Sequence, residues 1–95
     1  MYEGLRRRIG NRDATLLNNL AWAYAETGDY DRAVPLARRA WALEPRNPAT
    51  ADTLGWLLFK SGEDRMGGLA LLEQAAQGAP SDAEIRAHLK DARGG

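Results

Sequence analysis

The sequence contains no cysteine and a single histidine among its 95 residues. The missing cysteines exclude disulfide bonds, thiolate nucleophiles and cysteine-rich zinc sites. A lone histidine excludes any metal site built from two histidines of one chain. We therefore expect neither a metal ion nor a cofactor.

The chain also lacks net charge and long apolar runs. Thirteen basic residues balance thirteen acidic ones, so there is no overall positive field to attract nucleic acid or anionic lipid. No apolar run approaches the roughly 20 residues that a membrane-spanning helix needs, and the arginine-rich N-terminus lacks the apolar stretch of a signal peptide. The sequence therefore predicts no nucleic-acid partner and no insertion into a membrane.

An internal repeat is the main feature that the sequence does contain. Shifting the chain against itself by 34 residues aligns Leu-Ala-Trp at 20–22 with Leu-Gly-Trp at 54–56. Periods between about 20 and 50 residues are typical of repeat architectures. The chain, which has the length of one small domain, then divides into a leading segment, two repeats and a trailing segment, at residues 1–13, 14–47, 48–82 and 83–95.

Within each repeat the spacing of apolar residues is helical. Leu17, Leu20 and Tyr24 lie at i, i+3 and i+7, and signals for strands are missing throughout. Gly28 and Gly62 are suited to the C-termini of helices, where a positive φ is common. The predicted fold class is all-α, with five helices and a short sixth at the front, at about 2–9, 14–27, 30–44, 48–61, 65–78 and 82–93.

Proline and short polar residues predict how these helices begin. Asn47 is a good N-cap with Pro48 at the first helical position. Ser81, with Glu84 three residues later, forms the pattern of a capping box before the last helix. Pro35 is expected in the first turn of its helix, where its missing N–H costs little.

The two repeats resemble the tetratricopeptide repeat, whose pattern is W-x2-L-G-x2-Y, then A-x3-F, then P over about 34 residues. The matching residues are Leu17, Leu20, Ala21, Tyr24, Ala33, Ala37 and Pro45 in the first repeat and Ala51, Leu54, Gly55, Leu58, Gly68, Leu72 and Pro80 in the second. The strings LNNLAW and DTLGW are also similar to the last repeats of bacterial tetratricopeptide proteins. The resemblance implies a right-handed α-solenoid of stacked antiparallel helix-turn-helix repeats.

In this family the first helices of successive repeats line a concave groove that holds a segment of a partner protein. The resemblance places in that groove Asn18, Trp22, Glu26, Asp52, Trp56, Phe59 and Lys60. Trp22 and Trp56 occupy equivalent positions, and tryptophan is enriched at binding hot spots. Two interpretations stay open, because these indoles could bind a partner or pack between adjacent helices.

The two ends of the array differ in how they meet solvent. Ile85 and Leu89 form an apolar stripe on the trailing helix, and polar residues, His88 among them, cover the remainder, as is typical of a terminal cap. At the front, Tyr2, Leu5 and Ile9 form a short apolar stripe. Since arrays usually need about three repeats, we expect this stripe to contact another copy of the chain or further repeats of a longer protein.

These observations predict a non-enzymatic scaffold that binds a peptide or helix of a protein partner in the groove. The alternative is a structural end-cap of a longer array that self-associates through its N-terminal helix. No catalytic site is predicted, because the serines that could join His88 and Asp91 sit at turns. The sequence leaves the compartment unknown, with the cytoplasm as the default and the bacterial envelope or periplasm if the chain is a fragment.

Overall fold

The computed structural model describes residues 13–94, and within this range the chain forms α-helices and no strand. The helices are α2 (Ala14–Glu26), α3 (Tyr30–Leu43), α4 (Pro48–Ser61), α5 (Arg65–Gly78) and α6 (Ala83–Ala92). The predicted all-α fold is confirmed, and each of these bounds lies within one residue of its prediction. The helix expected at 2–9 lies outside the described residues.

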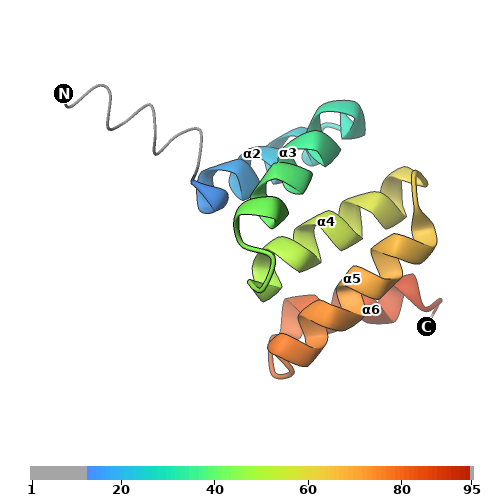
Figure 1. Ribbon diagram of the computed structural model, residues 1–95. Coiled ribbons are helices and arrows are strands. Elements are labelled where there is room, and N and C mark those ends of the chain that lie inside the picture. The colour runs from blue at the N-terminus through green and yellow to red at the C-terminus, as the bar shows by residue number, and fades with distance from the viewer. Residues whose placement is uncertain (1–12, 95) are drawn as a thin grey trace.

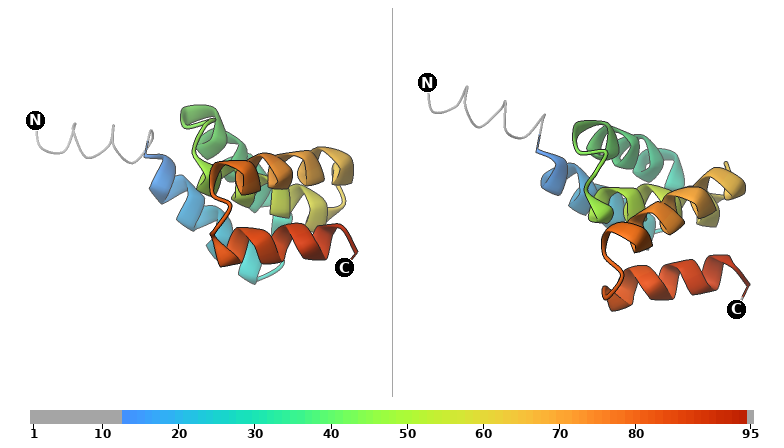
Figure 2. Two further views of the ribbon diagram at one scale, coloured as in Figure 1. Left: turned by 90° about the horizontal axis from the view of Figure 1, so that it is seen from below. Right: turned by 60° about the horizontal axis from the view of Figure 1, so that its bottom comes forward.

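The helices pack sequentially in antiparallel pairs (Figure 1). The first pair is α2 with α3 and the second is α4 with α5, while α3 also contacts α4 and so joins the pairs. The single helix α6 packs on both α5 and α4, and Figure 2 shows it running along the edge of the second pair. Because α2 and α6 both contact α4, the first helices of successive units are neighbours, with α4 in the middle.

A side-chain oxygen of Asp or Asn caps the start of every described helix. Asn47 caps α4 and Pro48 occupies its first turn, as predicted. The capping box predicted at Ser81 is wrong by one residue, because the Asp82 carboxylate accepts hydrogen bonds from the backbone N–H groups of Glu84 and Ile85. A carboxylate at this position also interacts favourably with the helix dipole.

Pro35 is the second local feature that differs from its prediction. It lies inside α3, beyond the first turn of a helix that begins at Tyr30. A proline there cannot donate a hydrogen bond to the carbonyl of Asp31, the residue four positions earlier. The structure therefore places the proline where it weakens α3, rather than where it begins the helix.

The largest core cluster lies between the two helical pairs. It contains Ala21, Ala33, Val34, Ala37, Leu54, Leu57 and Leu58. The predicted contact alanines, Ala21 and Ala33, have no exposed surface, so α2 and α3 approach each other closely. Trp41 packs against this cluster and against a second one that contains Ile85.

Two glycines determine how closely α4 and α5 approach. A Cβ atom built on Gly68 would lie 2.5 Å from the carbonyl oxygen of Gly55 and 2.9 Å from the backbone nitrogen of Phe59. A Cβ atom built on Gly55 would lie 2.7 Å from the carbonyl oxygen of Gly68. The two backbones therefore touch directly at this crossing, where both helices have a small residue of the repeat pattern.

A search of residues 13–94 for membrane-spanning helices gives none that is long and apolar enough.

Candidate functional site

The first helices of successive units share a row of stacked rings. His88 of α6 lies between Trp22 of α2 and Trp56 of α4, with ring centroids 5.7 and 4.3 Å apart and interplanar angles of 29° and 18°. Trp56 stacks in turn on Phe59, at 6.3 Å and 24°. We call Trp22, His88, Trp56 and Phe59 the aromatic row. Three helices therefore contribute to one continuous aromatic surface.

Hydrogen bonds to α4 fix two of these rings. The indole N–H of Trp22 donates to the Thr53 hydroxyl oxygen at 3.0 Å, and that hydroxyl donates to the carbonyl of Ala49 at 2.9 Å. His88 Nδ1 lies 2.8 and 3.1 Å from the two carboxylate oxygens of Asp52. Because Thr53 and Asp52 are themselves buried, both rings are held by groups that cannot readily move.

Helical spacing explains why these groups meet. Asp52 and Trp56 are four residues apart on α4, so they lie on the same face of that helix, and His88 contacts both. On α6, Ile85 precedes His88 by three residues and inserts into the core with 3% of its surface exposed. Anchoring by Ile85 therefore turns His88 toward α4 rather than toward solvent.

Charges of both signs border the aromatic row. The Lys60 ammonium lies 5.3 Å from the centroid of the Trp56 ring, and the Arg65 guanidinium lies 5.8 Å from that of Phe59. Both are at a distance where a cation is attracted to the face of a ring. Glu84 and Asp91 of α6 are close enough to His88 to act on its charge. The row is thus flanked by cations at its Phe59 end and by acids beside His88.

The surroundings of His88 raise its pKa above the ordinary value of 6.5. Burial of the ring is the largest single influence and lowers the pKa, because it disfavours the charged form. The hydrogen bond to Asp52 and the negative charges of Asp52, Glu84 and Asp91 together outweigh burial. The folded chain therefore binds the proton of His88 more tightly than the unfolded chain does.

We expect this linkage to make the fold more stable in mild acid than in mild base. A raised pKa contributes stability that is complete below the unfolded value of 6.5 and is lost as the pH rises through the higher folded value. Unfolding by urea, followed by circular dichroism from pH 6 to pH 9, should show this decline. A His88→Gln variant should show a flatter profile, because the chain has no other histidine, and a profile as steep as that of the wild type would contradict the assignment.

Comparison with known families matches residues 14–43 to a model that describes the tetratricopeptide repeat. These residues are a tetratricopeptide repeat. They contain α2 and α3, and α4 with α5 forms the next antiparallel pair, so the five helices are consistent with a stack of tetratricopeptide-like repeats. A comparison with curated proteins finds no match. Tetratricopeptide repeats are in general protein–protein interaction modules and are typically non-catalytic.

Several residues that the tetratricopeptide pattern places in a groove do come together. Trp22, Trp56 and Phe59 belong to the aromatic row, and Lys60 lies over the Trp56 ring. Both tryptophans are half-buried. Each therefore packs against neighbouring helices and also presents part of its ring to solvent, which combines the two interpretations of the sequence.

Three other predicted groove residues lie differently. Asp52 is 5% exposed and bonded to His88, so it positions His88 and is not available for direct contact with a partner. Asn18 is half-buried, and its side-chain oxygen accepts no hydrogen bond from the described part of the chain. Glu26 is exposed. The stripe of Tyr2, Leu5 and Ile9 proposed for self-association lies outside the described residues.

His88 is a site residue that the predicted groove set does not contain. The polar pattern of the trailing helix predicts a solvent-facing His88, and this prediction is wrong because only 14% of the side chain is exposed. Its partner Asp52 lies 36 residues earlier, and no local pattern joins them. The one available signal was the three-residue spacing from Ile85, which places His88 beside the apolar stripe of α6.

The described residues contain no group of three or more His, Cys, Asp or Glu side chains that could hold a metal ion.

Proposed function

We propose that this chain binds a peptide or helix of a partner protein on the aromatic row, with an apolar anchor of the partner against Trp22 and Trp56. The observation that carries the proposal is the pair of partly buried indoles joined through His88. Large rings held in place by neighbours lose little conformational entropy on binding, and tryptophan is enriched at hot spots. A tetratricopeptide repeat at residues 14–43 agrees with a role in protein–protein interaction.

The charges beside the row suggest how such a partner is oriented. Lys60 and Arg65 lie over the Trp56 and Phe59 rings, and Glu84 and Asp91 act on His88. Complementary charges contribute to specificity and to the rate of association more than to affinity. The proposed partner therefore has an apolar anchor, an acidic residue on the Lys60 side of it and a basic residue on the α6 side.

Calorimetric titration with designed peptides tests this proposal. We expect peptides with a central leucine or phenylalanine anchor to bind in the micromolar range, and the same peptides with alanine at the anchor to bind at least about tenfold more weakly. Reversing the charge of Lys60 with Lys60→Glu should lower the affinity for peptides whose acidic residue lies on that side. Arg39→Glu, at an exposed position of α3, is the matched control and should leave the affinity unchanged. Equal affinities for the leucine and alanine peptides would contradict an apolar anchor.

Self-association at the N-terminal end of the array is the second candidate function. Leu16 and Leu20 of α2 are each 41% exposed, and their spacing of four residues places them on one side of the helix. An apolar stripe of this kind favours a neighbouring helix, either from another copy of the chain or from further repeats. Analytical ultracentrifugation separates this candidate from peptide binding, since a strict monomer at high concentration would exclude contact between copies.

A further inference from the structure

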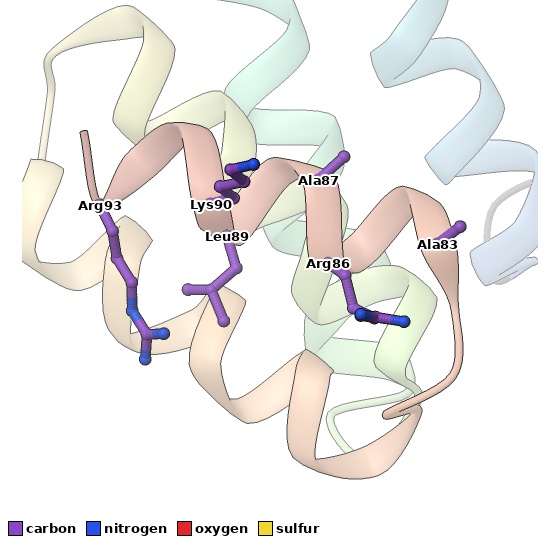
Figure 3. Close-up of a pocket in the computed structure, with 6 residues that line it drawn as sticks. All are labelled: Ala83, Arg86, Ala87, Leu89, Lys90 and Arg93. Atoms are coloured by element: carbon purple, nitrogen blue, oxygen red, sulfur yellow. The ribbon is translucent and has the colours of Figure 1, made fainter. Parts of the chain in front are cut away.

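A second surface lies on the outward side of α6. An open depression of about 700 Å³ is lined by Ala83, Arg86, Ala87, Leu89, Lys90 and Arg93 (Figure 3). A smaller one of about 510 Å³ lies between α5 and α6 and shares Leu89 and Arg93 with the first. The two depressions are therefore neighbours along the last helix. We call the six residues of the larger depression the α6 outer surface.

The side chains of this surface leave room for another helix. Ala83, Ala87 and Lys90 follow one another at i, i+4 and i+7, so they lie on one side of α6. Packed helices lie 8 to 10 Å apart, at a distance that depends on the side chains at the contact. Because alanine side chains are short, they allow a second helix to approach this side of α6 closely. Figure 3 shows Leu89 on the other side, between Arg86 and Arg93. The cationic side chains of Arg86, Lys90 and Arg93 therefore lie between the two alanines and Leu89.

The charges of α6 are separated between its two sides. Arg86, Lys90 and Arg93 line the outer surface, whereas Glu84 and Asp91 act on His88 at the aromatic row. Arg93 donates to a carboxylate oxygen of Glu73 at 3.0 Å. Among the described residues Arg86 and Lys90 form no ion pair. A chain of zero net charge therefore carries a local positive field at this surface.

We propose that the α6 outer surface docks an amphipathic helix of an acidic partner protein. The apolar stripe of that helix would lie on Ala83 and Ala87, and its carboxylates would pair with Arg86 and Lys90 beside them. A second copy of the chain does not fit through the same surface, because it would bring like charges together. This surface is separate from the aromatic row, so the proposal does not depend on peptide binding there.

Fluorescence anisotropy with two synthetic helical peptides tests the proposal. Both have the same leucine stripe, and one has glutamates beside it where the other has lysines. We expect the glutamate peptide to bind at least about tenfold more tightly than the lysine peptide, by a margin that shrinks with added salt. Equal affinities, or tighter binding of the lysine peptide, would overturn the proposal.

Variants of the full chain locate the binding. The Arg86→Glu/Lys90→Glu variant should weaken binding of the glutamate peptide by about tenfold or more. Arg39→Glu/Arg46→Glu, at exposed positions of the first repeat, is the matched control and should keep the wild-type affinity. The neutral variant Arg86→Gln/Lys90→Gln should show an intermediate loss, and it replaces the charge reversal if that variant fails to fold.

Vesicles of anionic lipid test whether the α6 outer surface binds a membrane instead of an acidic protein. We expect the chain not to bind vesicles that contain phosphatidylglycerol at physiological salt, because two cations, Arg86 and Lys90, that form no ion pair within residues 13–94 give only a weak attraction to a charged surface. Binding to vesicles that is lost in the Arg86→Glu/Lys90→Glu variant, without binding of the glutamate peptide, would assign the surface to lipid and overturn the proposal.

Discussion

Replacing Trp56 with alanine is expected to lower the free energy of unfolding by about 2 to 3 kcal/mol and to loosen α6. The ring stacks on His88 at 4.3 Å and on Phe59 at 6.3 Å, so its removal takes away packing on both sides. The expected loss is smaller than for a fully buried tryptophan because Trp56 is half-buried. Urea unfolding, followed by far-ultraviolet circular dichroism, measures it.

A conservative variant distinguishes the loss of the aromatic ring from its replacement by a smaller one. Trp56→Phe keeps a ring against His88 and should cost less than about 1.5 kcal/mol. If Trp56→Ala were as stable as the wild type, the aromatic row would be a coincidence of positions without energetic weight. Trp56 both packs against its neighbours and presents part of its ring to solvent. Peptide binding by the alanine variant is therefore measured without denaturant, at a temperature at which the variant is shown to be folded.

Replacing Gly68 with valine is expected to lower the free energy of unfolding by about 3 kcal/mol. The first added carbon would lie 2.5 Å from the carbonyl oxygen of Gly55 and 3.3 Å from the Cβ of Leu58, so α4 and α5 must separate. Valine has a higher helix propensity than glycine, and this difference offsets about 0.4 kcal/mol of the cost. Thermal unfolding should show a large fall in Tm.

Ala70→Val is the matched control for Gly68→Val. It introduces the same side chain into the same helix, at an exposed position, and should cost only about 0.5 kcal/mol through helix propensity. Similar losses in the two variants would mean that the close approach of α4 and α5 at Gly55 and Gly68 does not limit the packing.

The helices were predictable because their signals are local. Pro48 and Gly62 mark the start and end of α4, and the helix begins and ends beside them. The local signal at the start of α6 is ambiguous, because Ser81 and Asp82 are adjacent and both residue types can cap a helix. The prediction chose Ser81, but Asp82 makes the hydrogen bonds.

The site was predictable only where it follows from the repeat. The period of 34 residues identified Trp22 and Trp56 as equivalent, and the structure brings both rings to one row. The burial of Asp52 could not be predicted, because a carboxylate in a first helix is ordinarily exposed and leaves water only when a partner satisfies it. That partner is His88, on a helix distant in the sequence, and only the packing of α6 on α4 brings them together.

The pairing of Asp52 with His88 also changes the charge expected beside the tryptophans. An exposed Asp52 would add to the acids Glu84 and Asp91, whereas the observed carboxylate is buried and bonded to His88, which neutralises its charge when the ring is protonated. The remaining acids lie on the α6 side and Lys60 lies on the α4 side. A bound peptide would therefore meet opposite charges at the two edges of the row.

The indole resonances of the three tryptophans test most directly whether the aromatic row is a binding surface. The ¹⁵N-labelled chain is titrated with the leucine-anchored peptide while the indole N–H signals of Trp22, Trp56 and Trp41 are recorded. Trp41 serves as the internal control because it packs against the core clusters and is not part of the aromatic row. We expect saturable shifts of the Trp22 and Trp56 signals and little change at Trp41. Saturable binding that leaves Trp22 and Trp56 unchanged would contradict the proposal that this row holds the partner.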